Sequence, residues 1–309
     1  MVSAVSLEGV SKTYDDFHAV RDVSFEVPAG RITGFLGPNG AGKTSTIRMI
    51  LGLLPVSAGR ITVLGGDDAQ KVRERIGFLP EERGLYKRMT PIDAIAFFAG
   101  LKGVPEAEGR KRAKAMLEAQ GLGYAMKKPI KELSKGMAQK VQLLSALAHE
   151  PELVVLDEPF SGLDPVNQQA LEAMIREIAA RGATVLFSTH VMQHAERLCD
   201  KVVLMARGRK VFDGDVSTAR CAAPRALVLE GDLSAEQVAA LPGLGAVTSE
   251  TLPDGGWRHV AVLPPNGLGA GTGHDALKAA FARDLSLRRF ELKEPSLHDA
   301  FIVLTGGQA

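Results

Sequence analysis

The sequence predicts an α/β fold built on a mostly parallel sheet, followed by a small α+β unit. Two continuous apolar runs, Leu153–Leu156 and Thr184–Ser188, are typical of strands that are buried on both faces. From about 91 to 149, apolar residues recur at helical spacing. Strands that alternate with helices favour a parallel sheet. The composition changes near Ala219, where we expect the second unit to begin.

Length and composition limit the classes of protein that fit. A chain of 309 residues is long for one average domain, so we expect two. The net charge of +1 does not favour nucleic-acid binding. We expect no signal peptide and no membrane span, because the N-terminus lacks the pattern and no 18 consecutive residues are apolar. The two cysteines, Cys199 and Cys221, lack metal-type spacing and fit a reducing compartment.

The first third of the chain predicts several short strands. Val5–Val10 and Val23–Val27 alternate between apolar and polar residues. Pro28 to Gly30 then turns the chain into the buried strand Arg31–Leu36. Two more short strands are predicted, at Arg60–Leu64 and Ile76–Pro80.

A glycine-rich loop follows the strand Arg31–Leu36 and precedes a predicted helix. It fits the phosphate-binding loop of nucleoside triphosphatases. The candidate nucleotide contacts are Gly37, Pro38, Asn39, Gly40, Ala41, Gly42, Lys43, Thr44 and Ser45. Glycines let successive N–H groups turn toward one anion, and the helix start adds unpaired N–H groups. Lys43 can reach the β- and γ-phosphates, and the Thr44 hydroxyl can bind Mg²⁺. The alternative is a glycine-rich turn that binds nothing.

Two adjacent carboxylates, Asp157 and Glu158, end the buried strand Leu153–Leu156. A phosphate loop needs a carboxylate at this place to hold Mg²⁺. Because side chains alternate in direction along a strand, we expect Asp157 to serve the metal and Glu158 the attacking water. The alternative is an acidic pair that only caps the following turn.

The unit after about residue 219 predicts the order strand, helix, strand, strand, helix, strand. This order is that of a ferredoxin-like split βαβ sandwich. A final capped helix begins at Ser296. The other expected elements are strands Arg225–Gly231, Val247–Leu252, Arg258–Leu263 and Leu287–Leu292, helices from Ser234 and over His274–Arg283, and a glycine-rich loop, Gly267–Gly273.

Further motifs occur in the order found in ATP-binding-cassette (ABC) ATPases, and the chain resembles that family over roughly residues 3 to 219. The segment Leu133–Met137 resembles the signature, Ser161–Asp164 the D-loop, His190 the switch histidine, Tyr14 the adenine-stacking aromatic and Glu81 the Q-loop position. The resemblance implies a P-loop NTPase cassette with a parallel-sheet core, an antiparallel β subdomain and a helical subdomain at about 88–150. The cassette would span 1–219 and an accessory domain 220–309.

The resemblance also implies roles for individual residues. Lys43, Glu158 and His190 would be catalytic, with His190 donating to the γ-phosphate. Ser134 and Gly136 would contact ATP held by a second cassette, and Asp164 would lie in the shared site. Taken alone, Ser134 could be a plain helix cap, His190 a structural histidine and Tyr14 a core or rim residue. The implied cofactors are ATP and Mg²⁺.

Two departures from the family pattern change what we expect. The signature carries Lys135 and Met137 where glycine and glutamine are usual, but Ser134 and Gly136 remain. Glu81 replaces the Q-loop glutamine, so it could bind the metal and nucleotide or respond mainly to a partner. The loop Glu82–Tyr86 would suit a groove for a membrane subunit's helix; the alternative is a solvated charged loop.

The likeness predicts an ATP-hydrolysing subunit of an exporter. It would form a homodimer or heterodimer of cassettes and drive a separate membrane permease from the cytoplasmic face of the membrane. The segment Glu294–Phe301 resembles the accessory domain of drug- or sodium-export ATPases. One alternative is a soluble cassette ATPase that acts on nucleic acid or ribosomes, which the net charge does not favour. Another is a sensor that binds ATP without turnover, against which Glu158 and His190 argue.

Overall fold

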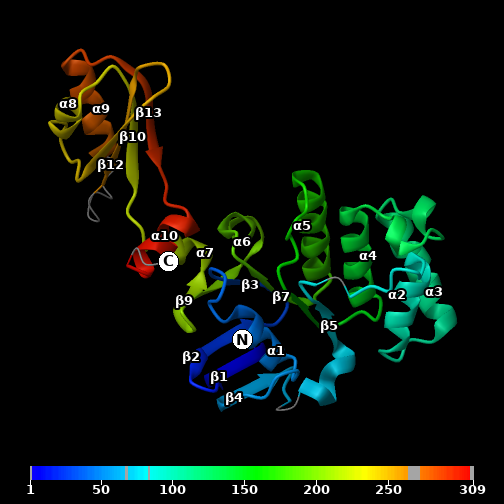
Figure 1. The fold of residues 1–309 in the computed structure, drawn as a ribbon. Helices are drawn as coiled ribbons and strands as arrows, with labels where there is room; N and C mark the ends of the chain where they lie inside the picture. Colours follow the sequence, from blue (N-terminus) through cyan, green and yellow to red (C-terminus); the bar gives the residue numbers. More distant parts are fainter. Residues whose placement is uncertain (1, 67–68, 83, 264–271, 307–309) are drawn as a thin grey trace. The chain divides into compact units, whose positions relative to one another are not determined.

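The computed structural model describes residues 2–66, 69–82, 84–263 and 272–306. The chain divides into two compact units, one reaching to Val216 and the other starting at Ser217 (Figure 1).

The first unit is built on a mixed sheet with the strand order β5-β6-β7-β3-β8-β9. All neighbours pair in parallel except β8 and β9, which form an antiparallel edge. Each residue of β3, β6 and β7 is buried, because helices cover both faces. The predicted parallel sheet is thus confirmed, and the β8–β9 edge adds to it. The strands are β3 Ile32–Leu36, β5 Ile76–Leu79, β6 Leu153–Leu156, β7 Thr184–Thr189, β8 Lys201–Ala206 and β9 Arg209–Asp215.

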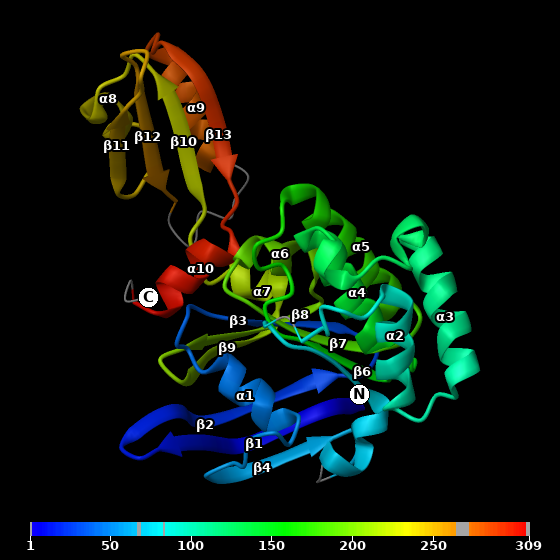
Figure 2. The ribbon, with the colours of Figure 1, turned by 45° about the vertical axis from the view of Figure 1, so that its right-hand side comes forward.

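An antiparallel sheet with the order β2-β1-β4 lies beside this core (Figure 2). Its strands are β1 Ser3–Tyr14, β2 Phe17–Pro28 and β4 Ala58–Val63. Helix α1, Lys43–Ile50, contributes Ile47 and Ile50 to the apolar cluster that joins the two sheets. Phe25 stacks on Phe35 at 5.3 Å between ring centroids. The predicted strand from Val5 was too short: pairing with β2 continues to Tyr14.

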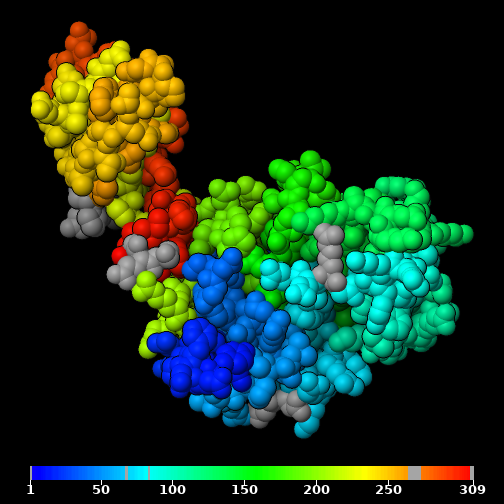
Figure 3. All heavy atoms as spheres, viewed as in Figure 1, coloured from blue at the N-terminus to red at the C-terminus, as the bar shows by residue number. Residues whose placement is uncertain are grey.

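The helical segment between β5 and β6 forms one continuous lobe of the first unit, cyan to green in Figure 3. Thr90 caps α2 by accepting from the Asp93 N–H, and Pro91 occupies the first turn. The helices are α2 Pro91–Gly100, α3 Glu106–Ala119 and α4 Lys135–Leu147, with short 3₁₀ turns at Gly123–Ala125 and Ile130–Glu132. Another 3₁₀ segment, Ala69–Arg75, precedes β5, and α5 Pro165–Ala180 and α6 Met192–Leu198 flank β7 in the chain.

The second unit contains an antiparallel sheet in the order β11-β12-β10-β13. This order confirms the predicted split βαβ, since β12 lies between the two strands that α8 connects. Capping boxes at Ser234 and Ser296 start α8 and α10 as predicted. The predicted loop Gly267–Gly273 lies mostly outside the described residues. The elements are β10 Ala226–Gly231, α8 Ala235–Ala239, β11 Val247–Thr251, β12 Trp257–Val262, α9 Thr272–Ala282, β13 Leu287–Lys293 and α10 Leu297–Leu304; α7, Val216–Arg220, precedes them.

Candidate functional site

The phosphate loop connects β3 to α1, where only glycine fits at two positions. Gly42 has a φ of +95°, and a β-carbon there would lie 2.6 Å from the Ala19 carbonyl oxygen. A β-carbon at Gly37 would lie 2.3 Å from the Met205 carbonyl oxygen. Both distances are far below van der Waals contact. The loop backbone therefore packs against neighbouring strands and presents a cradle without side chains, as an anion site requires.

Lys43 turns back over this cradle. Its Nζ donates to the carbonyl oxygens of Gly37 at 2.7 Å and Pro38 at 3.2 Å. It also lies 3.5 Å from Glu158 Oε1, and its residue is only 6% exposed. The Lys43 ammonium is therefore buried and surrounded by acceptors from the loop backbone and from Glu158.

Asp157 lies at the end of β6, beside the loop-bearing strands. Its Oδ1 accepts a 2.5 Å hydrogen bond from Ser188 Oγ, and its backbone N–H donates to the Leu79 carbonyl oxygen at 2.8 Å. Ser188 Oγ also accepts from the Glu158 N–H at 2.9 Å. Ser188 was not among the site residues predicted from the sequence. Its position on β7, two residues before His190, was the available signal, since alternate residues of a strand share a side.

Glu158 joins the residues predicted to be catalytic. Its Oε2 lies 3.0 Å from His190 Nδ1, and its Oε1 faces Lys43. The Glu158 backbone has a φ of +46°, which is strained for a residue with a side chain. Within the described part of the chain, the buried Oε1 has no hydrogen-bond partner. This oxygen faces the Lys43 ammonium, and a carboxylate is a group that can accept a proton from water.

A metal ion would need the nucleotide to complete its ligands. In the described ranges, no group of three or more His, Cys, Asp or Glu side chains could hold a metal. Thr44 and Ser45 occupy the first turn of α1, and Thr44 and Asp157 are the oxygen donors that fit Mg²⁺. The residues present therefore fit an ion held largely by phosphate oxygens and water. Glu81 is exposed, beyond the end of β5.

Tyr14 ends β1 and is 43% exposed. The Lys12 ammonium lies over its ring, 5.1 Å from the centroid, and donates to the Pro55 carbonyl oxygen at 2.9 Å. The ring is thus held at the surface by a cation–π contact, available for stacking.

The signature-like segment begins helix α4. Ser134 is the N-cap, and its Oγ accepts from the Met137 N–H at 3.3 Å. A β-carbon at Gly136 would lie 2.5 Å from the Asn167 side chain, so the first turn of α4 packs directly on α5. Buried Gln139 donates to the Pro159 carbonyl oxygen at 3.1 Å.

The D-loop-like segment lies against the same helix end. Asp164 caps α5, with its Oδ1 accepting from the Asn167 N–H at 3.0 Å, and these bonds lower the pKa of its carboxyl. A β-carbon at Gly162 would overlap with Lys135 Nζ. The signature helix, the D-loop and the segment after Glu158 thus form one packed assembly, which the sequence did not reveal.

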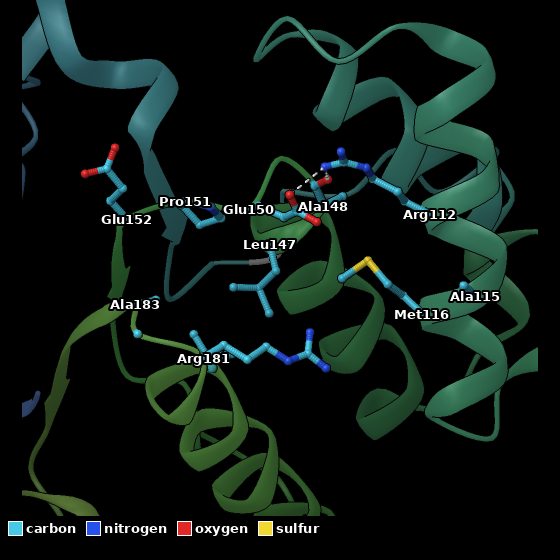
Figure 4. Close-up of a pocket in the computed structure, with 12 residues that line it drawn as sticks. Arg112, Ala115, Met116, Leu147, Ala148, Glu150, Pro151, Glu152, Arg181 and Ala183 are labelled. Atoms are coloured by element: carbon cyan, nitrogen blue, oxygen red, sulfur yellow. Dashed lines mark hydrogen bonds and ion pairs between the residues drawn. The ribbon is translucent and has the colours of Figure 1, made fainter. Parts of the chain in front are cut away.

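A separate cavity of about 560 Å³ lies at the other end of β6, between α3, the end of α4 and the end of α5 (Figure 4). Met116, Leu147 and the stems of two arginines line it. Arg112 is paired with Glu108 and Glu150, and Arg181 with Glu177. Since Asp157 follows the opposite end of the strand, this cavity is not part of the phosphate site.

Comparisons with known proteins decide the family. The protein-family model described as ABC transporter matches residues 20–161, which include the phosphate loop and Asp157–Glu158. The "Uncharacterized ABC transporter ATP-binding protein YhaQ" of Bacillus subtilis is 36% identical over 306 residues, 98% of this chain and 98% of that protein. The chain belongs to the ABC transporter family.

Other relatives match the cassette. The Nod factor export ATP-binding protein I of Ralstonia nicotianae is 37% identical over 213 residues, 68% of this chain and 66% of that protein. A solved structure of an ATP-binding subunit of an ABC transporter is 34% identical, with a TM-score of 0.65 over 71% of this chain and 92% of that chain. The chain is therefore an ABC transporter ATP-binding subunit, an ATPase of the transport-coupled class. Among the described residues, no helix combines the length and apolarity that crossing a bilayer requires.

Proposed function

We propose that this ABC subunit powers an exporter by closing two cassettes around ATP and Mg²⁺ and driving a separate membrane permease from the cytoplasmic side. The cluster of Lys43, Glu158 and His190 over a glycine cradle is the observation that carries the proposal. The export-type relative supports the direction of transport, because its name specifies export.

The residues of the cluster have distinct tasks in this proposal. Lys43 leaves the carbonyl oxygens of Gly37 and Pro38 and binds the β- and γ-phosphates, which offer it stronger, anionic acceptors. That movement frees Glu158 Oε1 to accept a proton from the attacking water. His190, held by Glu158 Oε2, donates to the γ-phosphate. Mg²⁺, bound by Thr44 and Asp157, would neutralise phosphate charge.

The second cassette would complete the site. Ser134 lies at the positive end of α4, and both Ser134 and Lys135 are exposed. Asp164 and the D-loop are packed against this helix end, so one rigid surface would meet the partner's nucleotide. Either an identical chain or a related one could be that partner.

The permease would dock near the Q-loop position. A cavity of about 280 Å³ there is lined by Phe78, Leu85 and Phe98, among others. Two aromatic residues next to it are exposed, Tyr86 by 57% and Phe97 by 41%, and their rings meet edge to face at 5.9 Å. Exposed aromatic side chains beside an apolar cavity are suited to receive a helix of a membrane subunit. Glu81 and Glu82 border this region. They would link docking of the permease to the nucleotide site.

The Glu158→Gln variant tests the proposal. The amide keeps the shape of the side chain but cannot accept the proton, so ATP should still bind while turnover falls by about 100-fold or more. ATP should then trap a dimer, measured by sedimentation velocity. The matched control is Glu172→Gln, a buried glutamate paired with His194 away from the loop, which should keep its turnover. Parental turnover in Glu158→Gln would contradict the assignment of the base.

A further inference from the structure

The sheet of the second unit has two unlike faces. Helices α8 and α9 lie on the same side of it (Figures 1 and 2). That side carries the apolar core of the unit, which includes Leu227, Leu229 and Ala261. Because side chains alternate along each strand, the intervening residues form the other face, which we call the open face. Neither α8 nor α9 covers the open face.

A row of alternating charges crosses the open face from edge to edge. The strand register places Glu250 opposite Arg258, Arg258 opposite Glu230, and Glu230 opposite Arg289. Each neighbouring pair is in contact: Arg258 Nε lies 3.2 Å and Arg289 NH1 3.4 Å from Glu230 Oε1, and Arg258 NH1 lies 3.3 Å from Glu250 Oε1. The row therefore reads minus, plus, minus, plus over β11, β12, β10 and β13.

Apolar residues lie beside this row. The next register positions hold Val260 opposite Val228, and the position after that holds Val262 opposite Ala226. Val228 is 4% exposed, while the other three are partly exposed. The Glu230 side chain at the centre of the row is only 18% exposed. On β10 and β12 the open face thus carries small apolar residues beside the charge row, and on β13 the same register positions hold Glu291 and Lys293.

We propose that the open face binds the open face of a second copy of this chain. A two-fold axis lying between the faces and parallel to the strands reverses the order of the row. Glu250 then faces Arg289 of the copy, and Arg258 faces Glu230 of the copy, so each charge meets its opposite. The same rotation brings the Val228 position opposite Val260, but Val228 is only 4% exposed, so the charge row and not the valines would carry the contact. A surface that is complementary to itself under a two-fold rotation is what an isologous dimer requires.

This contact adds a second dimer interface to the one in the proposed function. The ATP sandwich depends on nucleotide, whereas the open face does not. The open-face contact would therefore hold two subunits together after hydrolysis opens the sandwich. It depends on charge and should weaken as salt rises.

A pair of charge-reversed full-length chains tests the contact without nucleotide. Arg258→Glu and Glu230→Arg should each raise the dimer dissociation constant by about tenfold or more, because like charges then meet across the two-fold axis. Mixed in equal amounts, the two variants should dimerise again. In the mixed dimer, the introduced Glu of Arg258→Glu faces the introduced Arg of Glu230→Arg. The unchanged Glu230 of the first chain faces the unchanged Arg258 of the second, so every facing pair is again of opposite charge. If each variant failed to dimerise because its own chain was misfolded, mixing the two variants would not restore the dimer. Sedimentation velocity in low and high salt measures all three samples.

The controls distinguish loss of the open-face contact from misfolding and from a non-specific effect of charge. Circular dichroism must show that each variant is folded. Lys278→Glu places a similar charge change on α9, on the covered side, and should leave association unchanged. A parental chain that is monomeric without nucleotide at tens of micromolar, or variants that stay dimeric, or a mixture that does not recover the dimer, would each overturn the proposal. ATP-trapped dimerisation of Glu158→Gln depends on the cassettes, so that result reports the proposed function separately.

Discussion

At the residue scale, the candidate site is organised around one buried cation. The Lys43 ammonium donates to two loop carbonyl oxygens and lies near the Glu158 carboxylate. In the sequence, Glu158 follows Lys43 by more than a hundred residues. Without phosphate, Lys43 offsets the charge of Glu158. In the proposed function, phosphate would offer Lys43 better acceptors, and the Glu158 carboxylate would be released for chemistry.

Lys43→Ala should lose tight ATP binding. Hydrogen bonds to charged groups contribute about 1.5–3 kcal/mol, so affinity should fall by about 10- to 150-fold. Isothermal titration calorimetry with MgATP measures it. Lys12→Ala, which removes the cation over Tyr14 and leaves the loop intact, should have a smaller effect. Affinity within a few-fold of the parent in Lys43→Ala would be incompatible with the phosphate-loop assignment.

His149 gives the cassette a pH dependence of its own. Burial, with the nearby charge of Lys102 added, lowers the His149 pKa from 6.5 to about 4. Its Nε2 donates to the Ile76 carbonyl oxygen at 3.2 Å, which requires no positive charge. Between about pH 6.5 and 4, the unfolded chain binds a proton here that the folded chain does not, so folding stability falls as pH falls.

His149→Gln should remove that part of the pH dependence. We expect the urea midpoint of the parent to drop between pH 7.5 and pH 5, and that of the variant to drop less. His18→Gln, at an exposed site on the same unit, is the control and should behave as the parent. An equal drop in His149→Gln and the parent would assign the effect to other groups.

At the element scale, the first turn of α4 is held in place by contacts from several of its residues. Ser134 caps it, Gly136 lets it touch Asn167, and Gln139 ties it to the segment after β6. The helix end is therefore in direct contact with α5 and with the segment that leads into the D-loop. Such an assembly can present donors to a second cassette in a fixed geometry.

Ser134→Arg should keep ATP binding by the single subunit but prevent ATP-driven dimerisation and turnover. The large side chain would occupy the space in front of the helix end. Turnover should fall to a few per cent or less of the parent, measured by phosphate release. Ser134→Thr retains the cap and should retain activity. Full turnover in Ser134→Arg would show that the signature does not face a shared site.

At the scale of the whole molecule, two compact units follow one another along the chain. The second unit begins at Ser217, and Arg220 Nε donates to the Pro295 carbonyl oxygen within it at 2.6 Å. Ala219 is fully buried. A cut after Asp215, the last residue of β9, therefore keeps the whole sheet of the first unit and does not divide α7, as a cut near 219 would.

A chain ending at Asp215 should fold and bind ATP within a few-fold of the full chain. A chain ending at Ala206, the last residue of β8, is the control: it removes β9 and exposes the edge of β8, so it should unfold or aggregate. Thermal unfolding and ATP titration measure both. Loss of cooperative unfolding in the longer fragment would mean that the units are not independent.

The sequence by itself determined the features of this protein that are formed by residues close together in the chain. The glycines and Lys43 of the loop are contiguous, and Asp157 and Glu158 directly follow an apolar strand, so both features could be found by pattern. Strand and helix order in both units, and the caps at Ser234 and Ser296, were predictable for the same reason. Strand ends were less predictable, since β1 reaches Tyr14 only because β2 pairs with it.

Only the tertiary structure decided what depends on residues far apart in the chain. The Ser188–Asp157 bond, the Lys43–Glu158 contact and the packing of Gly162 against Lys135 each join different elements. The charge row on the open face depends on strand register: a shift of one residue would move Glu230 to the covered side. Register is fixed by the packing of the whole core. Side-chain geometry across strands therefore follows from the folded sheet and cannot be read from any local segment.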